Sequence, residues 1–358
     1  MTGPPVPPPD GVPHGDPTPG RSRPDRRRSG RGDRAMVPPA EFRSYYGRPV
    51  VKAPVWRHDI AAYLFTGGLA AGSAIVAAGA DLTGRPALRA SGRVTALAAL
   101  GASAYFLVND LGRPTRFHHM LRVAKPTSPM SVGTWILSAF GAAAGVAAAA
   151  EVTPWLPRRG VLGLAARVLP VAGRAGGLAA AATAPALATY TAVLLADTAT
   201  PSWHAAYPKL PFVFAGSALA SGGAAGLIGA PTDQAGPARA LAVGGAALEL
   251  AATHAVETRM GLLSEPYHEG RAGRWLRAAR VLTAAGAVGA VIGARSRTVS
   301  ALSGVALLAG SLSTRFGVFE AGKASADDPK YTVVPQRARL AGGAVDDPSG
   351  PAAAHPTT

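Results

Sequence analysis

Cysteine is absent from the 358-residue sequence. This absence excludes disulfide bonds, iron–sulfur clusters held by cysteine and zinc sites built from thiolates within the chain. Electron transfer through iron–sulfur clusters would therefore require another subunit. The eight histidines show neither a zinc-binding motif nor a pair at a spacing typical of haem ligation. We expect no metal site and no covalently bound cofactor in this chain.

Charged residues are also scarce, at 16% of the chain, and 36 Lys and Arg outnumber 20 Asp and Glu, for a net charge of +16. The charges are dense in the first 57 residues and in about the last 45. Nucleic-acid binding is disfavoured, because the basic residues are not interleaved with aromatic residues that stack on bases. Anionic lipid and the bias of positive charge toward cytoplasmic loops account for the charge better. This profile is typical of an integral membrane protein with polar ends.

Long runs of Ala, Gly, Leu and Val fill the middle of the chain. They predict an all-α integral membrane protein, a bundle of about eight transmembrane helices of roughly 18–23 residues each. Small residues favour close helix packing, the short connection Arg295–Arg297 predicts a helical hairpin, and Pro185 is expected to kink the fourth span. The predicted spans are Ile60–Ala80, Gly92–Val108, Val132–Glu151, Gly176–Ala196, Pro211–Ala230, Ala238–Val256, Ala278–Ala294 and Thr298–Phe316.

The sequence divides into three predicted parts. Residues 1–53 are rich in Pro, Gly and Arg, and we expect a disordered basic extension. Residues 54–318 form the transmembrane domain. Residues 319–358 form a polar tail, part of which is expected to dock a soluble partner, with binding to the lipid surface as the alternative. An even number of spans places both termini on one side of the plasma membrane, and the Lys and Arg distribution favours the cytoplasmic side.

A polar stretch from Asn109 to Ser131 interrupts the apolar runs. Lipid cannot satisfy such groups, so the stretch must lie at a bilayer surface or line a protected cavity. The simplest interpretation is an interfacial loop whose basic residues bind lipid headgroups.

The amino-acid sequence of this stretch resembles the NrfD/PsrC family. Members of this family are the integral membrane subunits of polysulfide reductase-like and related molybdenum or iron–sulfur oxidoreductases. The resemblance rests on DLGRP (110–114), RF (116–117), ML (120–121) and SPMSVGTW (128–135). It continues in YLFTGGLAAGS (63–73), YTAVLLADTATPSW (190–203) and LPFVFAGSALASGG (210–223), and the tail resembles actinobacterial members. The motif residues of the loop are Gly112, Arg113, Pro114, Arg116, Pro129 and Ser131.

The resemblance implies a membrane anchor that is not catalytic alone. Such a subunit passes electrons between a 4Fe-4S ferredoxin-like subunit and membrane quinone, here expected to be menaquinone. A molybdopterin catalytic subunit of the polysulfide reductase or formate dehydrogenase type, working in anaerobic respiration, lies beyond. The alternatives are a non-redox membrane scaffold and a small-solute or proton transporter. A transporter would predict an internal repeat and paired broken helices, which the sequence does not show; the scaffold stays open.

A quinone needs hydrogen-bond donors at its carbonyls, a flat apolar slot, and a nearby proton donor or acceptor. The implied site lies around the first four spans. Tyr190 and Trp203 have an alternative interpretation as interfacial aromatics, and Asp197 as a polar helix end. The candidate quinone-binding residues are Tyr190, Asp197, His204, His58, Tyr63, Asn109 and Asp110.

Ionisable residues also occur within the sixth predicted span. Their spacing places Glu249, His254 and Glu257 on one helix face. One interpretation is a path that moves protons between water and a redox site in the membrane. The other is that these residues pair with one another or with an arginine of another helix.

Overall fold

The computed structural model describes residues 49–343, and side-chain surroundings as far as residue 340. Over this range the regular secondary structure is entirely helical, which confirms the predicted all-α class. Most of the predicted N-terminal extension and the end of the predicted tail lie outside the described residues. The division of the chain at residues 53 and 318 therefore stays a prediction.

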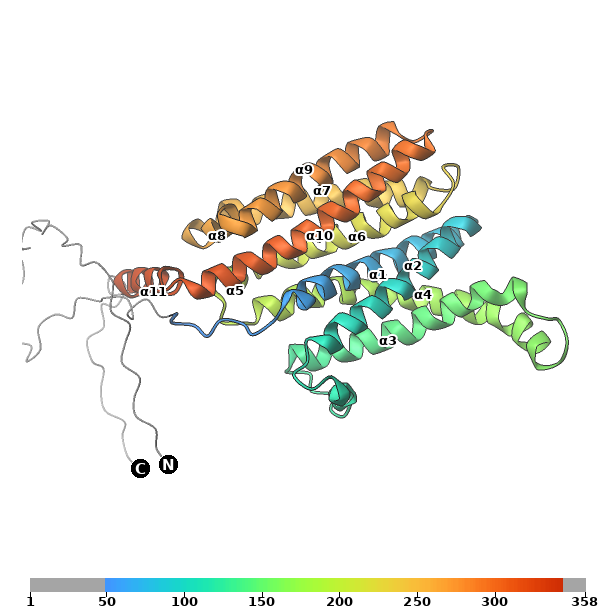
Figure 1. The fold of residues 1–358 in the computed structure, drawn as a ribbon, viewed down its shortest axis with the longest axis horizontal. Coiled ribbons are helices and arrows are strands. Elements are labelled where there is room, and N and C mark those ends of the chain that lie inside the picture. The colour runs from blue at the N-terminus through green and yellow to red at the C-terminus, as the bar shows by residue number, and fades with distance from the viewer. Residues whose placement is uncertain (1–48, 344–358) are drawn as a thin grey trace, which may run out of the picture. The chain divides into compact units, whose positions relative to one another are not determined.

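Eight long helices form the bundle (Figure 1), in agreement with the predicted number. Seven of them are long and apolar enough to cross a membrane; α7 falls short because it carries several ionisable residues. Short helices connect them. The long helices are α1 (His58–Leu82), α2 (Pro86–Asn109), α3 (Pro129–Ala149), α4 (Gly160–Ala196), α6 (Leu210–Gly229), α7 (Gly236–Arg259), α9 (Gly270–Ile292) and α10 (Arg297–Asp327). The short ones are η1 (Pro114–Leu121), η2 (Ala150–Trp155), α5 (Pro201–Ala205), η3 (Gly261–Ser264), α8 (Glu265–His268) and α11 (Lys330–Gly343).

Proline in the first turn marks where several long helices begin. Pro86, Pro129, Pro211 and Pro237 occupy these positions in α2, α3, α6 and α7. The ring sets φ for a helix, and the missing N–H has no partner in a first turn anyway.

Several helices extend beyond the predicted spans, and α4 and α10 do so by the most. Helix α4 begins at Gly160 rather than Gly176, and α10 ends at Asp327 rather than Phe316. The prediction limited each helix to the length that a bilayer crossing requires, whereas α4 has 37 residues and α10 has 31. Pro185 lies within α4, which is helical from end to end, so the kink stays a prediction. The hairpin at Arg295–Arg297 is observed between α9 and α10, which pack along each other (Figure 1).

Glycine and alanine allow the central helices to approach closely. A Cβ atom on Gly72 of α1 would lie 2.8 Å from the carbonyl carbon of Ala218 on α6. The two backbones are therefore in direct contact, as small residues permit in membrane bundles. Helix α1 packs on α2, α4 and α6, and α6 packs on α7 and α10.

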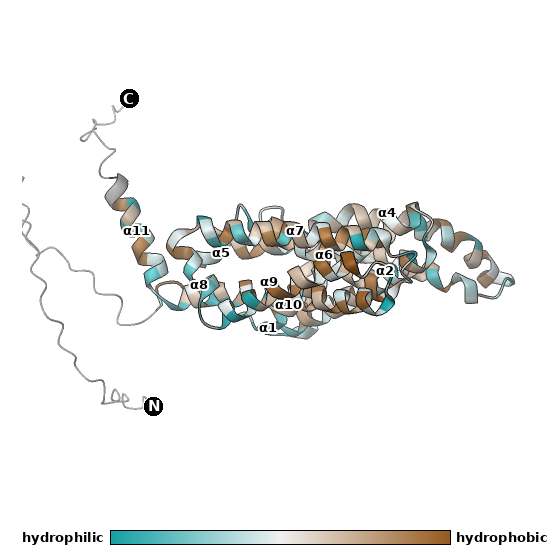
Figure 2. Cartoon of the chain, turned by 90° about the horizontal axis from the view of Figure 1, so that it is seen from above, coloured by the Kyte–Doolittle hydropathy of each residue, from teal (hydrophilic) through white to brown (hydrophobic). Residues whose placement is uncertain are grey.

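The start of α1 and the end of α10 meet at one end of the bundle, which we call the proximal end. His58 Nε2 lies 2.7 Å from Glu320 Oε1, and Lys323 donates to the carbonyl of Trp56 over 3.5 Å. This agrees with an even number of crossings, whereas the side of the membrane stays a prediction. Figure 2 shows apolar colours along the bundle, with strongly hydrophilic segments mainly toward its ends.

Candidate functional site

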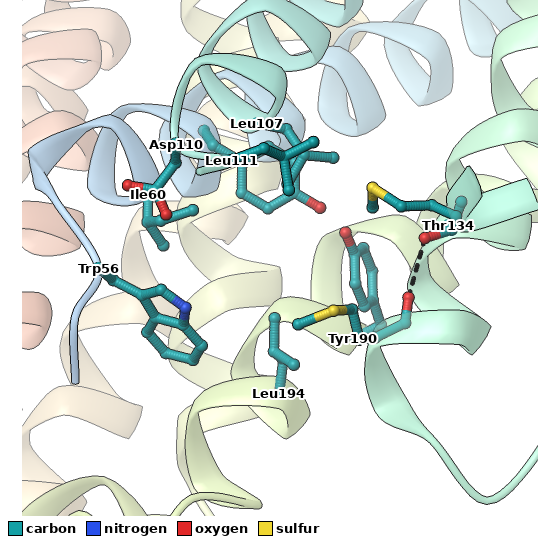
Figure 3. A pocket seen from close by; sticks show the side chains of 11 residues that line it. Trp56, Ile60, Leu107, Asp110, Leu111, Thr134, Tyr190 and Leu194 are labelled. Atoms are coloured by element: carbon teal, nitrogen blue, oxygen red, sulfur yellow. Dashed lines mark hydrogen bonds between the residues drawn. The ribbon is translucent and has the colours of Figure 1, made fainter. Parts of the chain in front are cut away.

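A pocket lies at the proximal end among α1, α2, η1, α3 and α4 (Figure 3). Its volume is about 80 Å³, and its walls are mostly apolar. The polar groups come from two tyrosines, one aspartate and one threonine. The lining residues are Trp56, Ile60, Tyr63, Leu107, Asp110, Leu111, Met120, Met130, Thr134, Tyr190 and Leu194.

Tyr190 of α4 forms one wall, and its ring lies directly on Gly133 of α3. A Cβ atom on Gly133 would lie 2.7 Å from Cδ2 and 2.8 Å from Cζ of that ring. Only glycine leaves room for the ring at this crossing, which gives a physical reason for the glycine in SPMSVGTW. Figure 3 shows Tyr190 across the pocket from Trp56, with Leu194 between them.

Asp110 sits at the end of α2 and holds the chain that leads into α1. Its Oδ1 atom accepts a hydrogen bond of 3.0 Å from the backbone N–H of Arg57. Beside it, Asn109 donates to Asp59 over 2.9 Å. These bonds fix the ends of two helices against each other, and they place the Asp110 carboxylate at the pocket.

Trp56 forms the opposite wall and is supported from behind. Its ring stacks on Trp203 of α5, with centroids 5.9 Å apart and 28° between the planes. Trp203 is fully buried and donates from Nε1 to the carbonyl of Val318 on α10 over 2.7 Å. The wall therefore depends on helices far along the chain.

The loop between α2 and α3, which we call the motif loop, contributes Leu111 and Met120 to the pocket lining. Ser131 accepts from the backbone N–H of Lys125 over 2.9 Å and donates to the carbonyl of Val123 over 3.0 Å. These bonds turn the loop back onto the start of α3, where Pro129 opens the helix. None of the six motif residues lines the pocket, and four of them are exposed, namely Gly112, Arg113, Pro114 and Arg116.

Of the seven predicted quinone-binding residues, the structure places Tyr63, Asp110 and Tyr190 in the pocket. The others lie outside it. Asp197 and His204 are exposed, since both follow the end of α4 at Ala196. His204 Nδ1 lies 3.0 Å from the Ala196 carbonyl. The remaining two are engaged elsewhere, His58 with Glu320 and Asn109 with Asp59.

Sequence reasoning missed the pocket residues Met120, Met130 and Thr134. A signal existed, since the chain has only five methionines and two of them fall in the polar stretch between the second and third spans. Met130 and Thr134 are four residues apart and therefore share a face of α3, where the Thr134 hydroxyl donates to the Met130 carbonyl over 3.0 Å (Figure 3).

The predicted face of α7 is only partly correct. Glu249 and Glu257 are buried, but His254 is exposed on the outer side of the helix. The prediction that one face carries all three residues is wrong, because 140° of helical rotation separates residues 249 and 254 at about 100° per residue. Glu257 instead pairs with Arg280 of α9 over 3.0 Å.

Arg315 of α10 was not predicted as a functional candidate. It is 1% exposed, donates from Nη2 to the carbonyl of Phe214 over 2.9 Å, and places its guanidinium 3.7 Å from the centre of the Phe214 ring. The sequence contains a signal for Arg315, since it is the only charged residue of the predicted span Thr298–Phe316.

Among residues 49–343, no group of three or more His, Asp and Glu side chains is arranged to hold a metal ion. A comparison with curated proteins gives no match. The model of one family, described as polysulphide reductase, NrfD, matches residues 49–232. That range is more than half of the chain and contains every residue of the pocket. The protein is a multi-pass membrane protein that belongs to the NrfD polysulphide reductase family.

Proposed function

We propose that this chain is the quinone-interacting membrane subunit of a respiratory oxidoreductase, and that the pocket at the proximal end binds the quinone ring. The observation that supports this most directly is the convergence of two tyrosines and one carboxylate, Tyr63, Tyr190 and Asp110, on an otherwise apolar pocket. Flat apolar walls with a few polar groups are typical of sites for small ring-shaped ligands.

The chemistry of a quinone matches these groups. Reduction adds two electrons and two protons, and both carbonyl oxygens become hydroxyls. The hydroxyls of Tyr63 and Tyr190 would donate hydrogen bonds to the carbonyl oxygens and stabilise the negative charge that develops there. Asp110, at the end of α2, would exchange protons between the ring and the surface.

The electrons must come from, or go to, another subunit, because this chain has no cysteine to hold a cluster. We propose a 4Fe-4S ferredoxin-like subunit as the immediate partner, a molybdopterin enzyme beyond it, and menaquinone as the substrate. The proximal end is then the face that docks the partner, which we place on the cytoplasmic side of the plasma membrane.

The pocket must widen to take a ring. A volume of about 80 Å³ is enough for several water molecules. Met120 and Met130 line the pocket, and an unbranched side chain with three rotatable bonds adapts readily to a ligand. Both come from the loop side, so the ring would enter between η1 and the start of α3.

The test compares pocket variants with a matched control in the purified complex. Tyr190→Phe and Asp110→Asn each remove one polar function while they keep the size of the side chain. In Tyr190→Phe, the loss of one hydrogen bond, about 0.5–1.5 kcal/mol net, weakens the binding of a short-chain menaquinone analogue roughly 2- to 13-fold. Asp110→Asn removes the group that exchanges protons, so it should lower quinol-linked turnover more than binding. Asp197→Asn makes a similar chemical change outside the pocket, and we expect it to bind like the wild type.

Binding is measured by titration of the analogue, and turnover by quinol-linked activity. Equal losses in Asp197→Asn and Asp110→Asn would move the site away from the pocket. A complex that assembles but binds no quinone would establish the scaffold alternative instead.

A further inference from the structure

A second polar centre is buried in the later half of the bundle, beyond the range matched by the family. Glu249 of α7 is 2% exposed, and Arg315 of α10 is 1% exposed. They are close enough to interact electrostatically, although no direct ion pair joins them within 4.0 Å. Opposite charges in a membrane interior mark a functional site more often than a packing element, because each is costly to bury.

The hydrogen bonding of this pair is incomplete. The Thr314 hydroxyl donates to Oε1 of Glu249, and one guanidinium nitrogen of Arg315 is used by the Phe214 carbonyl. Oε2 of Glu249 and the Nε and Nη1 atoms of Arg315 have no hydrogen-bond partner among the described residues. Free buried acceptor and donor atoms of this kind, on two residues that interact electrostatically, are the groups that bound water joins.

We propose that Glu249 is a proton-carrying site of this membrane protein, with Arg315 as the fixed charge that balances it. A proton adds to the free Oε2 atom and leaves from the same atom, and no electron is transferred. The proposal does not rest on the quinone site, since the residues come from α6, α7 and α10.

Polar groups lead from this centre toward the proximal end. Glu257 lies two turns further along α7, about 12 Å away at 1.5 Å per residue. Its Oε2 atom accepts from Arg280, whose side chain is 41% exposed, while its Oε1 atom has no partner among the described residues. This carboxylate therefore lies between the buried centre and the surface.

Hydroxyl groups also lie beside the centre. Ser217 of α6 and Ser311 of α10 are both buried, with their oxygens 2.7 Å apart. Further toward the opposite end, Thr283 and Ser300 carry buried hydroxyls without a partner among the described groups. A hydroxyl both donates and accepts, so such groups can pass a proton along a hydrogen-bonded chain.

The titratable and charged groups around Glu249 are few. Helix α10 contributes Arg315, α7 contributes Glu257, and α9 contributes Arg280 through its pair with Glu257. The groups that face the centre from α6 and α1 carry no charge. Helix α6 presents Ser217 and the ring of Phe214, and α1 presents Gly68, whose Cβ would lie 3.0 Å from Arg315 Nη2. His254 is exposed on the outer side of α7 and has no part in the proposal.

The experiment uses the purified full chain in lipid, without quinone or partner subunits. Infrared difference spectra are recorded as pH is varied, in water and in deuterium oxide. We expect the C=O stretching band of a protonated carboxyl that rises and falls with pH, shifts in deuterium oxide, and is lost in Glu249→Gln. Glu269→Gln removes an exposed carboxylate and should leave this band unchanged.

Two further variants separate a proton carrier from a structural ion pair. Arg315→Lys keeps the charge but changes its hydrogen bonds, so the band should stay and change in frequency. Glu257→Gln should slow the exchange of the band in deuterium oxide several-fold if Glu257 lies on the route. The proposal is overturned if no band that depends on Glu249 varies with pH. It is equally overturned if the band never exchanges, since Glu249 would then hold one state permanently.

Because no quinone is present, a negative result here leaves the proposed quinone function untouched. A loss of quinone binding in the pocket variants would in turn leave this band unchanged. Each proposal can therefore be refuted without affecting the other.

Discussion

Replacing Gly133 by alanine tests the geometry of the pocket at one atom. The added Cβ would lie 2.7 Å from Cδ2 and 2.8 Å from Cζ of Tyr190. The same Cβ would overlap Cε2 of the ring even more closely. Carbon atoms in contact are normally about 3.5–4.0 Å apart, so the ring must move by more than about 1 Å. Overpacking of this kind costs about 1–3 kcal/mol of stability. Since the ring forms a wall of the pocket, its hydroxyl moves with it.

We therefore expect Gly133→Ala to lower the thermal unfolding midpoint and to weaken binding of the menaquinone analogue. The loss should be at least that of the Tyr190 hydrogen bond, about 2- to 13-fold. Thermal unfolding in detergent and titration of the analogue measure the two effects on one preparation.

Gly145→Ala on the same helix is the matched control. No atom lies within 4 Å of the position that its Cβ would take. In a helix, alanine is favoured over glycine by about 0.5–1 kcal/mol, so this variant should be as stable as the wild type or more so.

A double variant decides whether the clash with Tyr190 is the cause. In a Tyr190→Ala background the ring is absent, and Gly133→Ala should then cost little or nothing. Such coupling between neighbouring residues is what a double-mutant cycle detects. If Gly133→Ala binds the analogue like the wild type, or is equally harmful without the ring, the packing described for this wall is wrong.

Three further predictions follow from single contacts. Gly322→Ala places a methyl group into the buried Trp203 ring, so stability should fall by about 1–3 kcal/mol and the pocket should lose its support. Ser131→Ala removes two hydrogen bonds of the motif loop, and hydrogen exchange in that loop should rise. Hydrogen bonds from Lys330 and then from Tyr331 lower the pKa of Glu265, so the attachment of α11 to α8 should loosen in acid.

The sign of the pH effect comes from the direction of that shift. A carboxylate with a lowered pKa contributes its full stability above the ordinary value of about 4.3 and loses it as pH falls through the lower folded pKa. Hydrogen exchange of α11 should therefore rise only in acid, and Glu265→Gln should remove the transition.

For the Gly322→Ala prediction, Gly244→Ala is the control, because its Cβ would have no neighbour within 4 Å. Unchanged exchange in Ser131→Ala would show that the loop is held by other contacts.

The fold could be predicted well because the bilayer imposes long apolar helices. Long and mostly apolar runs predicted all eight long helices, and prolines marked where several begin. The ends of α4 and α10 could not be predicted by the same rule. Both helices are longer than a bilayer crossing requires, and a rule based on bilayer thickness cannot detect this.

The pocket was predicted less completely. Tyr63, Asp110 and Tyr190 were predicted because each begins one of the motifs that carry the family resemblance. Asp197 was placed with them by its spacing, but its exposure depends on where α4 ends, which is a tertiary property. The sequence marks Arg315 as the only charged residue of its predicted span. Its proximity to Glu249 could not be predicted, because sequence spacing carries no information on which helices pack together.

The matched range ends at residue 232, yet the pocket depends on helices beyond it. Trp56 is held by Trp203, and Trp203 is held by the Val318 carbonyl of α10. A fragment that ended after the match would keep every motif but lose the support for this wall. Arg315 lies only three residues before Val318, about 4.5 Å along the same helix. One rigid element therefore carries both the support of the pocket and the charge beside Glu249, so a shift of α10 would alter the two sites together.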